Sequence, residues 1–299
     1  MKSPQSKHEK ILVIVNPVSG KGDVTELKKI IFRAAQKYSD SIMVEETTVQ
    51  KSAFSIAEKE IKSGVKRVIV CGGDGTVMEV VGAAVKKNVI LGVVPLGTGN
   101  LFAKNLHIPT ELKAALTTAF EGKVIKIDVG KANNTYFTII AGVGLDADVM
   151  SKTDHNLKNK FGIAAYIASG IKSLNKSSGR YRIRIDGKKL DHIKAKSIMI
   201  ANMGKITGGI KAVPGADPKS GTLKIGIIQA SHVTSWVSLL FNSIRGNINK
   251  SSYYKLYEGQ EVVIESLGKP QRYECDGEDF PPTKKLDIQI LHAALSVTV

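Results

Sequence analysis

The residues that decide the fold are 67–81, which read RVIVCGGDGTVMEVV. In the run Arg67–Cys71 the four residues after Arg67 are apolar and rich in β-branched side chains, which indicates a buried strand. A glycine-rich turn, Gly72–Gly75, follows this strand directly. Thr76 is expected to cap the next helix, with Glu79 three residues later completing a capping box. A buried strand that enters a helix through such a turn is typical of an α/β domain.

The same alternation of strand and helix continues outward from this segment. The expected strands are Ile11–Val15, Ser41–Glu45 and Ile90–Pro95. The expected helices are one that follows a cap at Asp23, with Glu26 in the box position, and another over Ala53–Lys62. Right-handed crossovers then predict a mainly parallel sheet. Ligands bind such sheets beyond the carboxyl ends of the strands.

From about Lys131 the pattern changes to short strands separated by turn signals, which indicates a β-rich second domain. The expected strands are Tyr136–Ala141, Arg180–Asp186, Ser197–Asn202, Leu223–Gln229 and Glu261–Ser266. Helical stretches are expected near 164–174 and 234–244. We therefore predict an α/β domain over residues 1–130 and a β-rich domain over 131–299, whose C-terminal segment can pack back on the first domain.

Composition excludes several classes of protein. The 299 residues are 42% apolar and 23% charged, which excludes bulk disorder. The longest apolar runs are far shorter than the roughly 20 residues of a membrane span, and the N-terminus has no signal-peptide core. Two cysteines make no disulfide scaffold, so we expect a cytoplasmic protein. The net charge of +16 suits a nucleic acid, an anionic membrane or a phosphorylated substrate, or serves solubility alone.

The Gly72–Thr76 turn has the chemistry of an anion site. Glycines let backbone amides approach a ligand, and the N-terminus of the following helix attracts negative charge. Asp74 fits such a site if a divalent cation bridges it to phosphate, or if it accepts bonds from a ribose or an amide. The alternative is a tight turn that Asp74 merely stabilises. The turn is neither a Walker A motif nor a dinucleotide fingerprint.

A second glycine-rich turn, PLGTGN at 95–100, follows the next expected strand, and Thr98 and Asn100 add polar groups to it. It lies one strand–helix–strand step after the first turn, so we expect the two turns to form opposite sides of one crevice.

The pairing of GGDGT with GTGN resembles the diacylglycerol kinase catalytic-domain family, which includes bacterial diacylglycerol kinases, related lipid kinases and sphingosine kinases. Further matching segments are NPVSGKG (16–22), Thr47, IDVGKAN (127–133), AGVGLDADVM (141–150) and CDGED (275–279). The resemblance implies an α/β nucleotide domain, a β-sandwich lipid-substrate domain and a site in the cleft between them. It also implies ATP and Mg²⁺ as the cofactors.

The resemblance also implies roles for individual residues. Glu278 would be the general base, with Asp276 beside it ordering the metal or the turn. The alternative for Asp276-Gly277-Glu278 is a plain hairpin turn. The metal ligands would be Asp74, Asp128 and Asp217. The nucleotide would be held by Asn16, Pro17, Ser19, Gly20, Thr47, Gly72, Gly73, Asp74, Gly75, Thr76, Glu79, Gly97, Thr98 and Asn100.

Two positions depart from the family pattern. Leu101 stands where many relatives have an aspartate that joins the acidic network around the metal. Ser220 stands where several bacterial relatives have the aspartate of a structural Mg²⁺ site, although Asp217 is near enough to substitute.

Charge suggests a partner as well. The stretch 158–196 holds eleven lysines and arginines against two aspartates. Such an excess favours an anionic membrane surface over nucleic acid, because stacking aromatics are scarce in it. The alternative is a solvated strand face on which Arg180, Arg182 and Arg184 alternate. Trp236 can enter lipid from the 234–244 helix, with burial in the core as its alternative.

These observations predict an ATP- and Mg²⁺-dependent lipid kinase, cytoplasmic and peripheral to the inner face of the membrane, with diacylglycerol as the first acceptor to consider. The alternatives are a catalytically weak nucleotide or lipid sensor, an NAD kinase, and a nucleic-acid-binding protein. A homodimer is left open.

Overall fold

The computed structural model describes residues 10–19, 24–144, 178–205, 213–230 and 248–299, together with 232, 234–235, 238–239 and 242. The chain divides into two compact units. The first comprises Met1–Ile127 and Ala293–Val299, and the second comprises Asp128–His292. The chain therefore passes from the first unit to the second after Ile127 and returns after His292.

The first unit is built on a parallel sheet. Its strands are β1 (Ile11–Val15), β2 (Ile42–Glu46), β3 (Arg67–Gly72) and β4 (Ile90–Pro95), in the order β2-β1-β3-β4. The end of β16 (Lys285–Thr298) adds a further parallel strand, with Ser296 opposite Ile90. Every residue of β1 and β3 is buried, as their continuous apolar runs predict.

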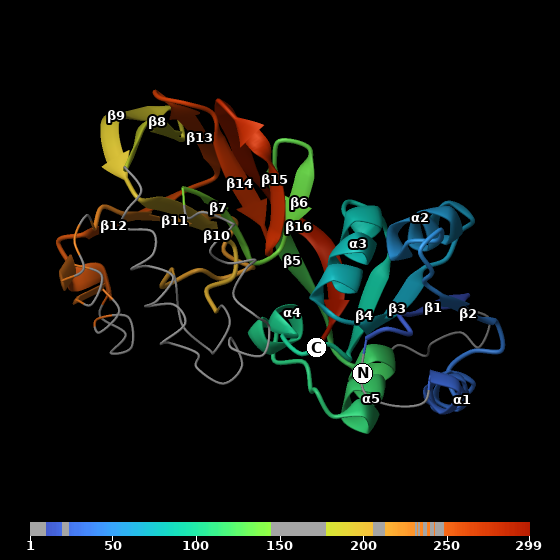
Figure 1. Ribbon diagram of the computed structural model, residues 1–299. Helices are drawn as coiled ribbons and strands as arrows, with labels where there is room; N and C mark the ends of the chain where they lie inside the picture. Colours follow the sequence, from blue (N-terminus) through green and yellow to red (C-terminus); the bar gives the residue numbers. More distant parts are fainter. Residues whose placement is uncertain are drawn as a thin grey trace. The chain divides into compact units, whose positions relative to one another are not determined.

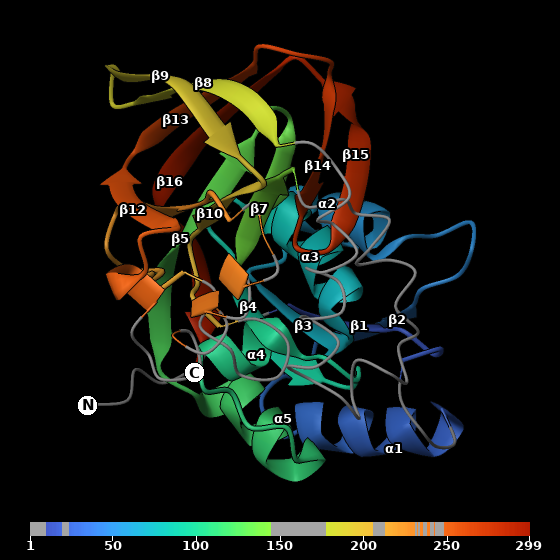
Figure 2. The same cartoon turned by 60° about the vertical axis from the view of Figure 1, so that its left-hand side comes forward.

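Helices cover both faces of this sheet, as Figures 1 and 2 show. They are α1 (Val24–Ala35), α2 (Ala53–Lys62), α3 (Asp74–Ala84), α4 (Leu101–Asn105) and α5 (Leu112–Glu121). α1 and α5 lie on one face, where Ile31 and Phe120 are fully or almost fully buried against the strands. α2 and α3 lie on the other face.

The helix starts show where local sequence signals succeed and fail. Ser52 caps α2 as an ordinary N-cap, its hydroxyl accepting from Ser55 N at 3.2 Å. The expected cap at Thr76 is wrong, because α3 already begins at Asp74 and Gly73 is its N-cap. Thr76 instead lies buried in the first turn. The expected cap at Asp23 lies outside the described residues.

The second unit is a pair of antiparallel sheets, so the predicted fold class is confirmed. The remaining strands are β5 (Val124–Ala132), β6 (Thr135–Phe137), β7 (Ile140–Val143), β8 (Gly179–Ile185), β9 (Lys188–Ala195), β10 (Ser197–Ala201), β11 (Leu223–Ile228), β12 (Tyr254–Gly259), β13 (Glu261–Ser266), β14 (Gln271–Cys275) and β15 (Glu278–Thr283). One sheet contains β16-β13-β8-β9, and the other has the order β12-β11-β10-β7-β14-β15. A 3-10 turn spans Ile248–Lys250.

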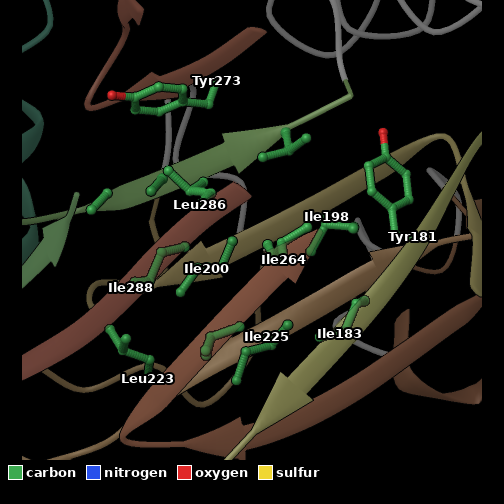
Figure 3. Close-up of a cluster of buried hydrophobic side chains, with 14 of the residues drawn as sticks. Tyr181, Ile183, Ile198, Ile200, Leu223, Ile225, Ile264, Tyr273, Leu286 and Ile288 are labelled. Atoms are coloured by element: carbon green, nitrogen blue, oxygen red, sulfur yellow. The ribbon is translucent and has the colours of Figure 1, made fainter. Parts of the chain in front are cut away.

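Inward-facing side chains of both sheets form the core of the second unit (Figure 3). Ile183 of β8 and Ile264 of β13 come from one sheet, and Ile198 and Ile225 come from the other. The period-two alternation of these strands places their polar residues on the outer faces.

One expected strand is divided in the structure. Tyr136–Ala141 was expected to be continuous, but β6 ends at Phe137 and β7 begins at Ile140. The backbone N–H groups of Thr138 and Ile139 donate to the side chain of Asp276 rather than to a neighbouring strand. The helical stretch expected at 164–174 lies outside the described residues, as does most of that at 234–244, including Trp236. In the described part of the chain, no helix has the length and apolarity to cross a bilayer.

Candidate active site

Three loops of the first unit meet at the carboxyl ends of β1, β3 and β4. The backbone N–H of Asn16 donates to Cys71 O at 2.9 Å, which ties the first loop to the second. Leu96 N donates to Gly72 O at 2.9 Å, which ties the third loop to the second. The predicted crevice loops are therefore neighbours, although their sequences are far apart.

The two glycine-rich loops touch backbone to backbone. A Cβ atom at Gly97 would lie 2.7 Å from Gly73 Cα, closer than real Cβ contacts allow. A Cβ atom at Gly99 would lie 2.8 Å from Asp74 Oδ2. Glycine is therefore needed at position 97, where the obstacle is backbone, whereas a side chain at position 99 would require only the Asp74 carboxylate to shift.

Asn16 connects the first loop to α3. Its Nδ2 donates to Thr76 Oγ1 at 2.8 Å, and its Oδ1 accepts from Val18 N at 3.0 Å. Ser19 N donates to Asn16 O at 3.1 Å, so the loop folds back on itself beside Pro17. These bonds explain why an asparagine and a threonine occupy positions 16 and 76.

The N-terminus of α3 is open toward these loops. Its N-cap, Gly73, offers no side-chain acceptor to the first-turn amides. Asp74 Oδ1 accepts instead from Phe102 N at 3.1 Å, so this carboxylate satisfies the start of α4. A Cβ atom at Gly75 would meet no atom of the described residues within 4 Å. The first turn of α3 therefore has no side-chain cap and, among the described residues, no neighbour beside Gly75, which suits a phosphate group.

The first turn of α3 and the glycine turn at 95–100 together form a cradle. The other predicted nucleotide contacts differ in their exposure and in their hydrogen bonds. Thr47 follows the end of β2, and its N–H donates to Val15 O at 3.0 Å. Thr98 is exposed, and Asn100 is buried with its Nδ2 donating to Gly97 O at 2.7 Å. Asn100 Oδ1 has no hydrogen-bond partner among the described residues, which leaves an acceptor for a ligand or a water. Gly20 lies outside the described residues.

Glu79 makes a contact inside the first unit. Its Oε2 accepts from Phe54 N at 3.1 Å, at the first turn of α2. Its predicted role at the nucleotide stays a prediction.

The three predicted metal ligands differ in how many of their carboxylate oxygens already contact other protein groups. In the second unit, Asp128 is buried; its Oδ2 accepts from Gly221 N at 2.7 Å and its Oδ1 lies 2.8 Å from His292 Nδ1. Asp217 Oδ1 accepts from Lys219 N at 3.0 Å. Among the residues that the structure describes, no three histidine, cysteine or carboxylate side chains gather as a metal site. Among the described residues Asp74 accepts through Oδ1 alone, so its Oδ2 offers the donor chemistry that Mg²⁺ prefers.

The two departures from the family pattern have visible consequences. Ser220 Oγ donates to Asp217 O at 2.9 Å, beside the bond from Ser220 N to the same oxygen at 3.1 Å, so Ser220 helps to close the 217–221 turn. Leu101 is the first residue of α4 and is half-buried.

The second unit carries the other predicted catalytic group on a tight hairpin. Asp276 and Gly277 both have positive φ, at 49° and 89°, and Glu278 follows them as the exposed first residue of β15. The hairpin alternative is thus realised as a two-residue loop, and it presents Glu278 at its end. Burial raises the pKa of the inward-facing Asp276 carboxyl to about 6, against the opposing effect of four hydrogen bonds from residues 138–140.

The basic strand face is partly neutralised by acids from neighbouring strands. Arg182 pairs with Asp191 at 2.8 Å and with Glu265 at 3.4 Å, and Arg184 pairs with Glu265 at 3.2 Å. The local excess of positive charge is therefore smaller than the sequence segment alone indicates.

Sequence reasoning missed two residues that support the Glu278 hairpin. Thr138 and Asn202 are both fully buried polar residues that hydrogen-bond within this region. The available signal is a single polar residue, Thr138, inside the apolar run YFTIIAGV at 136–143.

Comparison with known proteins agrees with this geometry. Residues 10–132 match the pattern of the diacylglycerol kinase catalytic domain, and residues 139–299 match the YegS C-terminal NAD kinase beta sandwich-like domain. A diacylglycerol kinase of Staphylococcus aureus (strain JH9) is 30% identical over 279 residues, covering 89% of this chain and 85% of that protein.

Solved structures show the same architecture. A diacylglycerol kinase from Bacillus anthracis (strain Sterne) superposes with a TM-score of 0.79 at 26% identity, covering 98% of this chain and 97% of the other. An NAD kinase from Archaeoglobus fulgidus in complex with ATP has a TM-score of 0.51 at 13% identity, over 97% and 93% of the two chains. This second likeness concerns the fold alone.

Proposed function

The chain belongs to the diacylglycerol kinase catalytic-domain family, and from that premise we propose that it is an ATP-dependent lipid kinase. It transfers the γ-phosphate of ATP to the hydroxyl group of a lipid, with diacylglycerol as the first acceptor. The observation that carries the proposal is the open N-terminus of α3 beside two glycine loops in contact.

The nucleotide half of the reaction needs positioning and charge neutralisation. The first-turn amides of α3 bind phosphate oxygens, and Gly75 leaves the space for them. Bound Mg²⁺ would neutralise charge on the phosphates, with Asp74 as its protein ligand. Asn16 holds Thr76 in place, so the loop after β1 keeps the cradle in shape.

The acceptor half of the reaction needs a proton acceptor. Glu278 is exposed at the end of a rigid hairpin, and as a carboxylate it removes the proton from the lipid hydroxyl as the phosphate is transferred. No other group is assigned to this step.

Such an enzyme meets its acceptor at a membrane surface. We propose that it associates peripherally with the anionic inner face of the membrane, because the net charge is +16 and each exposed cation near such a surface contributes about 1 kcal/mol.

The decisive experiment measures phosphate transfer from labelled ATP into a panel of lipid hydroxyls in mixed micelles. The panel holds diacylglycerol, monoacylglycerol, sphingoid base, polyprenol and phosphatidylglycerol, with NAD as a non-lipid acceptor. Wild type is compared with Glu278→Gln and Asp74→Asn, with Mg²⁺ and with chelator. Asp279→Asn removes an exposed charge next to Glu278 and serves as the matched control.

Each outcome decides between functions. Transfer to one lipid class that is lost in both variants and in chelator supports the kinase and identifies the acceptor. Transfer to NAD alone indicates an NAD kinase. ATP binding without transfer to any acceptor contradicts the proposal and indicates a sensor, which Leu101 and the single cradle carboxylate Asp74 would explain.

A further inference from the structure

The carboxylate of Asp276 points inward, away from solvent, onto a short stretch of backbone. Its Oδ2 accepts from Thr138 N at 2.7 Å and from Thr138 Oγ1 at 3.0 Å. Its Oδ1 accepts from Ile139 N at 2.9 Å and from Ile140 N at 2.8 Å. Four donors thus saturate one carboxylate, and hydrogen bonds to a charged acceptor are stronger than those between neutral groups.

The stretch 138–140 is itself held from its other side. Asn202 Nδ2 donates to Thr138 O at 2.9 Å, and Asn202 N donates to Ile139 O at 2.9 Å. Asp276 N donates to Ile140 O at 2.9 Å, so backbone and side chain of Asp276 grip the same segment. Thr138 and Asn202 are both fully buried, which makes this segment a rigid platform.

The position of Glu278 depends on the same hairpin. Cys275 pairs with Glu278 across the two-residue loop, so the position of Glu278 depends on the loop conformation. The positive φ of Asp276 is unfavourable for a residue with a Cβ atom, and the four bonds to its side chain offset that strain.

We propose that Asp276 is a positioning residue whose carboxylate clamps the hairpin to residues 138–140 and thereby fixes Glu278 in its working place. The inference rests on the proposed function in taking Glu278 as the base. Because both oxygens of Asp276 already accept protein donors, the residue acts through Glu278 and contacts neither a metal nor the substrate. The sequence-based expectation that Asp276 orders the turn is the one retained.

A double-mutant cycle tests this role. Asp276→Asn places an N–H group against N–H donors and loosens the clamp. A displacement of about 1 Å lowers kcat about 100-fold, while the KM for ATP stays within about twofold because the cradle is untouched. In the Glu278→Gln background, Asp276→Asn has no further effect on kcat. Equal losses in both backgrounds, or a raised KM for ATP, would overturn the proposal.

Two controls keep the result interpretable. Asp279→Asn removes the same charge from an exposed position on the same hairpin and leaves kcat unchanged. If Asp276→Asn does not fold, Thr138→Val removes one of the four donors and is expected to lower kcat by a smaller factor, again only when Glu278 is present. A Thr138→Val loss that persists in the Glu278→Gln background contradicts the proposal.

A readout without catalysis separates this inference from the proposed function. Amide hydrogen exchange of residues 138–140, measured by mass spectrometry, should be at least about tenfold faster in Asp276→Asn than in wild type and in Asp279→Asn. Unchanged exchange overturns the clamp even if the protein is a lipid kinase. If wild type transfers phosphate to no lipid but exchange is accelerated, the clamp stands and the proposed function fails.

Discussion

At the scale of residues, the space available for a Cβ atom at the glycines determines how closely the nucleotide loops can approach each other. Three glycines of the site have different surroundings: Gly97 faces backbone, Gly99 faces a carboxylate, and Gly75 faces no described residue. Only Gly97 is required by the protein itself, because the Asp74 carboxylate that faces Gly99 is a side-chain end that can shift. Gly75 lies in the first turn of α3, where no described residue requires the absence of a side chain, so the proposed phosphate ligand is the explanation for this glycine.

Gly97→Ala should separate the two glycine loops. The added Cβ would lie 2.7 Å from Gly73 Cα, and a backbone neighbour cannot rotate away. We expect the Kd for ATP, measured by calorimetry, to rise at least about tenfold, equivalent to about 1.4 kcal/mol. Gly82→Ala is the matched control, because its Cβ makes an ordinary 3.5 Å contact with Phe54 and should add about 0.5–1 kcal/mol of stability. Wild-type affinity in Gly97→Ala would contradict the argument.

The raised pKa of Asp276 predicts an unusual pH dependence of stability. Its pKa is raised from 3.8 to about 6 by burial, so the folded protein takes up this proton at a higher pH than the unfolded chain. The contribution to stability is therefore full below about pH 4 and is lost as the pH rises through about 6. Relative to Asp276→Asn, wild type should gain at most about 3 kcal/mol between pH 7 and pH 4. Urea unfolding at several pH values measures this, and a constant difference would exclude it.

At the scale of elements, the sequence predicted those helices and strands that have a regular period or a continuous apolar run. β1, β3, β4 and α2 match their expected ranges within one residue, because their patterns are strong and local. α5 was not expected, although Glu111 caps it by accepting from Lys113 N and Ala114 N. Glutamate is an uncommon N-cap, so the usual start signal was absent.

The hydrogen bonds of the site residues could not be predicted from the sequence, because they depend on tertiary contacts. The carboxylate of Asp74 accepts from Phe102 N at the start of α4 and does not cap its own helix, α3. Asp276 interrupts a strand that lies 136 to 138 residues away in the sequence. Neither contact leaves a periodic signal in the sequence. The motifs therefore predicted which residues belong to the site, whereas their hydrogen-bond partners could be identified only from the folded structure.

The cap of α5 yields a prediction about acid stability. Two backbone hydrogen bonds, to Ala114 N and Lys113 N, lower the pKa of Glu111 below its usual value. A lowered pKa means that the stabilisation is present above the unfolded pKa and is lost as the pH falls through the folded one. Glu111→Gln should therefore have a lower Tm than wild type at pH 7, and the difference should shrink toward pH 3. Thermal unfolding followed by circular dichroism tests this, and a difference that grows on acidification would refute it.

At the scale of the whole molecule, the charge balance predicts salt-sensitive membrane binding. A chain with a net charge of +16 should bind phosphatidylglycerol vesicles and ignore phosphatidylcholine vesicles. Raising the salt from about 0.1 M to about 1 M shortens the Debye length from about 10 Å to about 3 Å, so most of this binding should disappear. Vesicle sedimentation measures it. Binding that persists in high salt would instead indicate insertion of apolar groups.

The return of the chain to the first unit has a consequence for biosynthesis. Residues 293–299 place Ser296 beside Ile90 of β4, and Val299 N donates to Lys123 O at 3.0 Å. During translation these residues leave the ribosome after the entire second unit. The first unit, though made first, must wait with an uncovered β4 edge until the rest of the chain has emerged, and such an edge invites wrong pairing. The sheet of the first unit can therefore be completed only after the whole second unit has been synthesised.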